Sequence, residues 1–339
     1  MKLKLCLLSF LLVLTAGNVW CADPGLRYIN TRGVVRCGTP SDNKIFAYKD
    51  DDGVWQGISV EICRVISTAV FGRSDRIKMV QVPEVLVSKA LATNKIDVMI
   101  GGMPYSATHE ISSKAAPVDV LYYDRMVFLS RDTGKAKSMK DFQGEKVCVV
   151  QDNDDLKRLM SYSDHYKLDL QPAPFQTASS AKANFLLKRC RLLAGNYMLL
   201  QDILINTPGG LDNVEMLPET IDERPVYLFT WKENTTLRIV LKWILNAMKF
   251  AENVGLTQDN YNFNLSSNNP EIRNLLGIDE KLWNRFRLEP NWVQIMLKER
   301  GNYGEIFEKV LGEKSRFKIK RGKNNLLKNG GLMTSEPFI

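Results

Sequence analysis

The chain has 339 residues, of which 45% are hydrophobic and 25% are charged, and its formal net charge is +8 at pH 7. This length suits about two domains. The apolar content is that of a globular protein. No internal segment approaches the roughly 20 apolar residues of a membrane-spanning helix, which excludes a protein built on internal membrane spans.

The first residues read "MKLKLCLLSFLLVLTAG", with two lysines ahead of a short apolar stretch. This pattern predicts a secretory signal peptide over residues 1–22 rather than a buried helix or a membrane anchor. We expect cleavage just after Cys21, so that the mature chain starts near Ala22 or Asp23 and is periplasmic. No lipid is expected on Cys21, because the preceding Trp20 is too bulky for a lipid-attachment motif.

Strand and helix patterns alternate in the first part of the mature chain. The stretch 57–72 places its apolar side chains on one helical face and stops at Gly72. The predicted elements, in chain order, are a strand at 33–39, a helix at 57–72, a strand at 77–82, a helix at 85–93 and a strand at 96–100. Strands separated by helices indicate a parallel sheet in an α/β unit.

The same alternation returns further along the chain. The predicted elements are a strand at 145–150, a helix at 154–163, a strand at 174–177, a helix at 179–190 and a strand at 191–196. The segments 123–132 and 224–233 are extended and rich in β-formers, so the chain crosses between the two units twice. Two crossings predict a hinge, with a ligand cleft between the lobes at the carboxyl ends of their strands. Long helices follow, predicted at 236–253, 269–277 and 290–312.

One turn stands out between the two units. The stretch "GGMPYSATHEI", residues 101–111, leads from a strand through a glycine-rich loop into a helix start that carries His109. Backbone amides in such a turn bind anions. The catalytic motifs that we sought are missing: the chain has no G-x-S-x-G elbow and no phosphate-binding loop, and "HEISS" lacks the second histidine of a zinc-protease helix. We therefore predict no cofactor and no metal.

A basic run, "EKSRFKIKRGKNNLLK", occupies residues 313–328. A nucleic-acid-binding arm and a solvated basic surface both fit such a run. We favour the solvated surface, because the run carries no recognised nucleic-acid motif and the protein is expected to be exported. No nucleic-acid partner is predicted.

Four cysteines remain after the predicted cleavage: Cys37, Cys63, Cys148 and Cys190. An even number in an exported chain indicates two disulfides rather than inert thiols or a zinc site, for which the spacing is too scattered. The residues alone leave three connectivities open.

Several stretches resemble the periplasmic solute-binding proteins of polar amino-acid ABC importers, solute-binding family 3, and within it the general L-amino-acid-binding type. The matching stretches include "RGVVRCGT", "DDGVWQGISVEICRVISTAVFG", "AENVGLT", "NPEIRNLLG", "GNYGEIFEKVLG" and "NNLLKNGGLMTSEPF". The resemblance implies an α/β fold of two lobes, the type II periplasmic-binding-protein fold, with parallel-type sheets flanked by helices and two hinge strands. Lobe 1 is then 23–125 plus 229–339, and lobe 2 is 126–228.

The resemblance also implies a function and a covalent framework. The protein would act as a monomer without catalysis, bind a small polar solute such as an amino acid in the cleft, and deliver it to an inner-membrane ABC permease. The cysteines fall where this branch has cysteines, which implies the pairs Cys37–Cys63 and Cys148–Cys190.

The ligand-binding positions implied by the resemblance are Phe46, Gly102, Ser106, His109, Gln151, Asp152, Asn153 and Asn196. Several depart from the family pattern. His109 stands where relatives have an arginine that pairs with the ligand carboxylate, and Pro104 and Ser106 stand at threonine positions. The stretch 151–153 replaces a Thr-Gly-Thr turn, and Asn196 replaces the aspartate that holds the ligand ammonium.

Because a histidine offers fewer donors than a guanidinium and less charge at pH 7, we expect weak or no binding of unmodified L-amino acids. Three functions remain open at this point. The first is an importer component, with an amino-acid or a different solute. The second is a dehydratase or lyase on the same fold, with His109 and Asp152 or Asp154 as acid and base. The third is an accessory protein that has lost transport.

Overall fold

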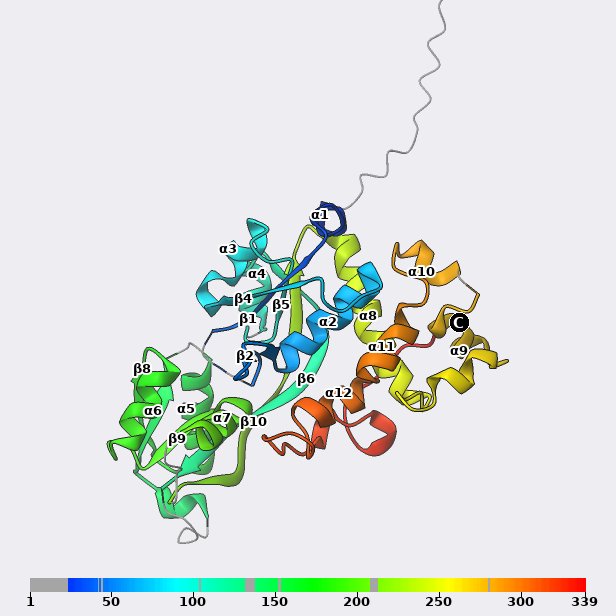
Figure 1. Ribbon diagram of the computed structural model, residues 1–339. Helices are drawn as coiled ribbons and strands as arrows, with labels where there is room; N and C mark the ends of the chain where they lie inside the picture. The colour runs from blue at the N-terminus through cyan, green and yellow to red at the C-terminus, as the bar shows by residue number, and fades with distance from the viewer. Residues whose placement is uncertain are drawn as a thin grey trace, which may run out of the picture.

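A computed structural model describes residues 24–41, 43, 45–103, 105–131, 138–151, 154–207, 213–279 and 281–339. The predicted signal peptide lies outside these residues. Eight strands form one sheet in the order β4-β1-β5-β10-β6-β9-β7-β8 (Figure 1). Among the helices of the described ranges, none is both long and apolar enough to cross a membrane.

Three parallel strands form the first strand group: β1 (Val35–Pro40), β4 (Ile77–Val82) and β5 (Val98–Ile100). Helix α2 (Ile58–Phe71) packs on this group with its apolar face and ends at Gly72, whose φ of 67° allows the left-handed cap. The remaining elements here are α1 (Pro24–Arg32), the hairpin β2 (Tyr48–Lys49) and β3 (Trp55–Gln56), the 3-10 turn η1 (Glu84–Leu86), α3 (Val87–Ala92) and α4 (Ala107–Ser112).

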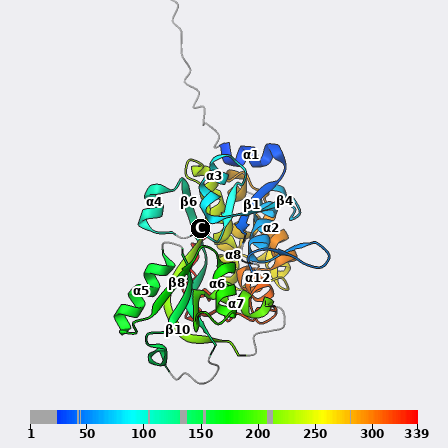
Figure 2. The same ribbon diagram turned by 90° about the vertical axis from the view of Figure 1, so that its left-hand side faces the viewer.

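The second strand group consists of β7 (Lys146–Val150), β8 (Gln171–Phe175) and β9 (Leu192–Asn196), again parallel. Its surrounding helices are η2 (Met139–Phe142), α5 (Asp155–Tyr166), α6 (Ala178–Leu186) and α7 (Tyr197–Asn206). Figure 2 shows α5 and α4 on the same side of the molecule, each beside its own strand group.

Two long antiparallel strands, β6 (Ala115–Ser130) and β10 (Glu215–Trp231), connect the strand groups (Figure 1). They include 123–130 and 224–231 of the two segments that the sequence predicts to be extended crossings, so that prediction is confirmed over those residues. Strand β6 pairs with β9 from Met126 onward, and β10 pairs with β5 from Leu228 onward. These are the points at which the sequence predicts a change of lobe, and the lobe bounds themselves stay a prediction.

Helices after β10 form the largest part of the hydrophobic core, together with α2. They are α8 (Thr235–Asn253), η3 (Tyr261–Ser266), α9 (Pro270–Leu276), α10 (Lys281–Arg285), α11 (Trp292–Arg300), α12 (Tyr303–Val310), η4 (Gly322–Asn324) and η5 (Leu327–Asn329). Figure 1 shows α9, α11 and α12 gathered on the side away from the second strand group. The chain from α12 to η4 then returns to the connecting strand β6, where Asn324 hydrogen-bonds to Tyr123.

Some predicted elements are displaced. The segment 290–312 is divided into α11 and α12, because Gly301 has a φ of 82° and Asn302 starts a new helix with a capping box. Strand β8 begins three residues before the predicted 174–177, and its prolines are tolerated because it is an edge strand. The predicted helix 85–93 is a 3-10 turn followed by α3.

Both disulfides implied by the resemblance are confirmed. Cys37 on β1 is bonded to Cys63 on α2, with their Cα atoms 6.1 Å apart. Cys148 on β7 is bonded to Cys190, with their Cα atoms 5.6 Å apart. Each bond joins elements of a single strand group, so neither one spans the connecting strands.

Candidate functional site

The turn after β5 packs closely against the loop after β1. Gly101 and Gly102 have φ values of 77° and 68°. A Cβ on Gly101 would lie 2.3 Å from Cε1 of Phe46, and a Cβ on Gly102 would lie 2.1 Å from Cγ of Pro40. Both positions therefore require glycine. Phe46 is 5% exposed, and its ring centroid lies 5.9 Å from that of Tyr122. The Phe46 ring therefore packs against the turn at Gly101.

His109 is tied to the first turn of its own short helix. The hydroxyl of Ser106 accepts a hydrogen bond from the His109 amide at 3.4 Å and lies 2.9 Å from His109 Nδ1. Tyr105 beside it donates its hydroxyl proton to Glu110 at 2.5 Å. The structure thus brings Ser106 and His109 together, and one imidazole nitrogen is already engaged. Pro104 lies outside the described residues.

The other part of the predicted site belongs to the second strand group and follows the end of β7. The amide of Gln151 donates to the carbonyl of Phe175 at 2.6 Å, and its side-chain oxygen accepts from Gln176 at 2.9 Å. Asp152 and Asn153 lie outside the described residues. Asp154 occupies the N-cap position of α5 and lies 3.9 Å from Arg158.

Asn196 ends β9 and begins α7, and its side chain is occupied by an arginine from β10. The guanidinium of Arg224 donates to Asn196 Oδ1 at 2.6 Å, and the same nitrogen forms an ion pair with Asp155. Arg224 was not among the predicted site residues. Arg224 could have been noticed because it is a charged side chain inside the extended segment 224–233. Its partner Asn196, however, lies 28 residues away in the sequence and on another strand.

Asp124 lies directly across from Arg224 in the pairing of β6 with β10 and is 6% exposed. Burial raises its pKa to about 6, against the lowering effects of hydrogen bonds from the Arg125 and Met198 amides and of the Arg224 charge. A buried, charged cluster therefore sits on the connecting strands beside the end of β9.

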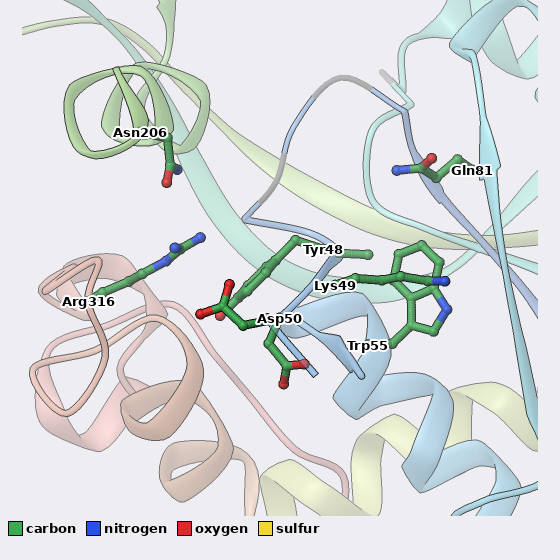
Figure 3. A pocket seen from close by; sticks show the side chains of 9 residues that line it. Tyr48, Lys49, Asp50, Trp55, Gln81, Asn206 and Arg316 are labelled. Atoms are coloured by element: carbon green, nitrogen blue, oxygen red, sulfur yellow. The ribbon is translucent and has the colours of Figure 1, made fainter. Parts of the chain in front are cut away.

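A cavity of about 730 Å³ lies next to the hairpin (Figure 3). It is lined by residues of the hairpin, of β4, of α7 and of the chain after α12, including Tyr48, Lys49, Asp50, Trp55, Gln81, Asn206 and Arg316. Of the six predicted ligand residues that the structure describes, none lines this cavity. Its walls come from four separate segments, so no single stretch of the sequence indicates it.

In the part of the chain that the structure describes, no three His, Cys, Asp or Glu side chains form a group that could hold a metal ion. The predicted site residues that the structure describes carry hydroxyl, imidazole and amide groups, and Arg224 and Asp155 beside Asn196 add a guanidinium and a carboxylate. Such groups bind polar solutes through hydrogen bonds and charge pairs.

The chain belongs to the bacterial extracellular solute-binding proteins, family 3, which match it over residues 35–313. Members of this family are solute-binding components of transport systems, and the predicted α/β periplasmic-binding-protein fold is confirmed.

Similar proteins cover nearly the whole chain. YhdW of Escherichia coli K12, named as an amino-acid ABC transporter-binding protein, is 28% identical over 96% of this chain and 95% of its own. The general L-amino acid-binding periplasmic protein AapJ of Rhizobium johnstonii is 27% identical over 96% of both chains. A periplasmic binding protein from Brucella ovis, solved with glutathione bound, is 28% identical with a TM-score of 0.86, covering 93% of this chain and 99% of its own.

A smaller protein shares the fold over part of this chain. Holo ArgBP from T. maritima, with a TM-score of 0.53 and 18% identity, is covered over 98% of its length but matches only 67% of this chain. At this identity the likeness concerns the fold alone.

Proposed function

We propose that this protein is the periplasmic solute-binding component of an ABC importer. The observation that carries the proposal is the near-complete match, at full length, to the solute-bound Brucella ovis protein. The solute is held between the carboxyl ends of the two strand groups, where the Gly101–Gly102 turn and the Ser106–His109 pair face the segment from Gln151 and the end of β9. The loaded protein, a monomer, then docks on an inner-membrane permease.

The solute is a small peptide-like molecule, with glutathione as the model compound, rather than a free L-amino acid. An α-ammonium at Asn196 would have to compete with the Arg224 guanidinium for the same side-chain oxygen, and the two cations would repel each other. A solute that presents an amide or a carboxylate to Arg224 would neither compete for the Asn196 oxygen nor be repelled by the guanidinium. On the other side, His109 supplies weaker carboxylate recognition than an arginine would.

Strands β6 and β10 act as the hinge between lobe 1, 23–125 plus 229–339, and lobe 2, 126–228. Closure around a ligand through a few residues in connecting strands is a general mode of domain motion. The residues between Tyr123, which Asn324 holds, and Met126, where pairing with β9 starts, are the ones we expect to bend. The first 22 residues direct export and are removed.

A thermal-shift screen tests the proposal. The mature protein is heated alone and with glutathione, each of the twenty L-amino acids and several di- and tripeptides. A ligand that binds only the folded state stabilises it by mass action, so glutathione should raise the melting temperature by a few degrees. The absence of any shift with every polar solute tested would contradict an importer role.

A matched pair of variants locates the effect, because the chain has only two histidines. His109→Ala should reduce the glutathione-dependent shift, since it removes a donor at the predicted site. His165→Ala, an exposed position on α5, should leave the shift unchanged. An equal reduction of the glutathione-dependent shift in both variants would indicate that the solute does not bind at His109.

A further inference from the structure

We propose that the cavity beside the hairpin is a subsite for the far charged end of an elongated, zwitterionic, peptide-like solute, and that Arg316 is its main carboxylate-binding group. This inference rests on the proposed function and adds to it a second point of attachment, away from the eight residues predicted from the family.

Arg316 is presented by an anchored segment. The adjacent Phe317 is buried, and its carbonyl accepts a hydrogen bond from Gln201 of α7 at 2.9 Å. The Arg316 guanidinium stacks on the ring of Tyr48 at 4.4 Å and on that of Phe317 at 4.8 Å. Within the described ranges these ring contacts are its interactions, and no described acid pairs with it. Its hydrogen-bond donors therefore remain available, although the side chain is exposed, while its guanidinium packs on the two rings.

Charges of both signs line the cavity. Lys49, whose ammonium lies 5.5 Å from the Trp55 ring centroid, and Arg316 supply two positive charges, and Asp50 and Asp51 supply two negative charges. Asp50 is held in place by the Val54 amide and the Gln56 side chain, each at 2.8 Å, and these hydrogen bonds lower its pKa. A balanced lining disfavours a simple anion or cation and favours a solute with separated charges of both signs.

Size and geometry agree with this class of solute. A volume of about 730 Å³ is in the range of pockets for molecules well above the size of one amino acid. In Figure 3 the Asn206 amide and the Arg316 guanidinium point toward the same space from two different segments. Amide side chains such as Asn206 and Gln81 can pair with peptide groups between the charged ends of the solute.

Calorimetric titration with glutathione and with L-glutamate tests the subsite. Wild type should bind glutathione. Arg316→Gln should weaken glutathione binding by about ten- to a hundredfold, the usual effect of losing a charge-assisted contact, and change any L-glutamate affinity less than twofold. Asn206→Ala, at another residue that lines the cavity, should also weaken glutathione binding. The control Lys318→Gln removes an exposed charge that does not line the cavity, and should match wild type.

Three outcomes would overturn the subsite. Glutathione could bind to Arg316→Gln within twofold of wild type, or Lys318→Gln could lose as much affinity as Arg316→Gln, which would indicate a general effect of surface charge. Wild type could also bind amino acids but not glutathione. That result would contradict the proposed subsite, while the proposed importer role would still stand. If wild type bound no solute at all, both proposals would fall together.

Discussion

The side-chain oxygen of Asn196 accepts a hydrogen bond from the guanidinium of Arg224 at 2.6 Å, although one residue ends β9 and the other lies on the connecting strand β10. The same guanidinium pairs with Asp155 at the start of α5. One side chain therefore links the connecting strands to two elements of the second strand group, at the position where the solute is proposed to bind. This link has consequences for stability that can be measured without knowing the solute.

Replacing Arg224 with alanine should lower the free energy of unfolding by about 2 to 3 kcal/mol. The reason is that Asp155, whose side chain is 6% exposed, loses its closest cationic partner, and uncompensated buried charges are costly. Chemical denaturation of both proteins measures the difference. The control is Arg73→Ala, which breaks an ion pair with both side chains more than half exposed and should change stability by less than about 1 kcal/mol. Equal effects of the two substitutions would contradict the assigned role of Arg224.

The Asp124 carboxyl predicts a pH dependence of stability. Its pKa is raised from 3.8 to about 6 by burial, so the folded state binds a proton more tightly than the unfolded state. This contribution to stability is fully present below pH 4 and is lost as the pH rises to about 6, a change of about 3 kcal/mol by linkage.

Asp124→Asn removes this titration. The stability of the variant relative to wild type should therefore increase by about 2 kcal/mol between pH 4 and pH 7. Denaturation curves of both proteins at several pH values give this difference, and other titrating groups cancel in it. A difference that stays constant with pH, or decreases, would contradict the raised pKa.

Asn324 makes two hydrogen bonds to the main chain of Tyr123, as a neighbouring strand would. Its side-chain oxygen accepts from the Tyr123 amide at 2.6 Å, and its nitrogen donates to the Tyr123 carbonyl at 3.0 Å. Asn324→Ala should cost about 1 to 3 kcal/mol, because it removes both hydrogen bonds from two partly buried main-chain groups of Tyr123. Asn325→Ala, which loses one exposed contact to Gly322, is the control and should cost far less. Similar losses in both variants would show that the contact to Tyr123 contributes little.

Much of the fold could be predicted from local patterns. The strands β1, β4 and β7 and the helices α2 and α8 were predicted almost to the residue, because each has a clear period and a distinct end such as Gly72. The hairpin 48–56 and helix α7 were missed. The hairpin strands are two residues long, and α7 follows β9 with no loop between them, so neither one produces an independent pattern.

The site was predictable only in part. The Ser106–His109 contact falls within four residues, and both positions were predicted to lie in the site. The Asn196–Arg224 contact and the cavity beside the hairpin depend on which strands and segments become neighbours in space. That information comes from tertiary packing. A family pattern aligned along the chain points to Asn196, but it cannot show that the side chain is already engaged by Arg224.

Calorimetric titration of the wild-type mature protein with glutathione and with each of the twenty L-amino acids, at pH 6 and pH 8, tests the central claim most directly. We predict that glutathione binds with a dissociation constant in the micromolar range or below, and that the unmodified amino acids bind weakly or not at all. Submicromolar, pH-independent binding of an ordinary L-amino acid, with no heat from glutathione, would contradict the claim and assign the protein to ordinary amino-acid uptake.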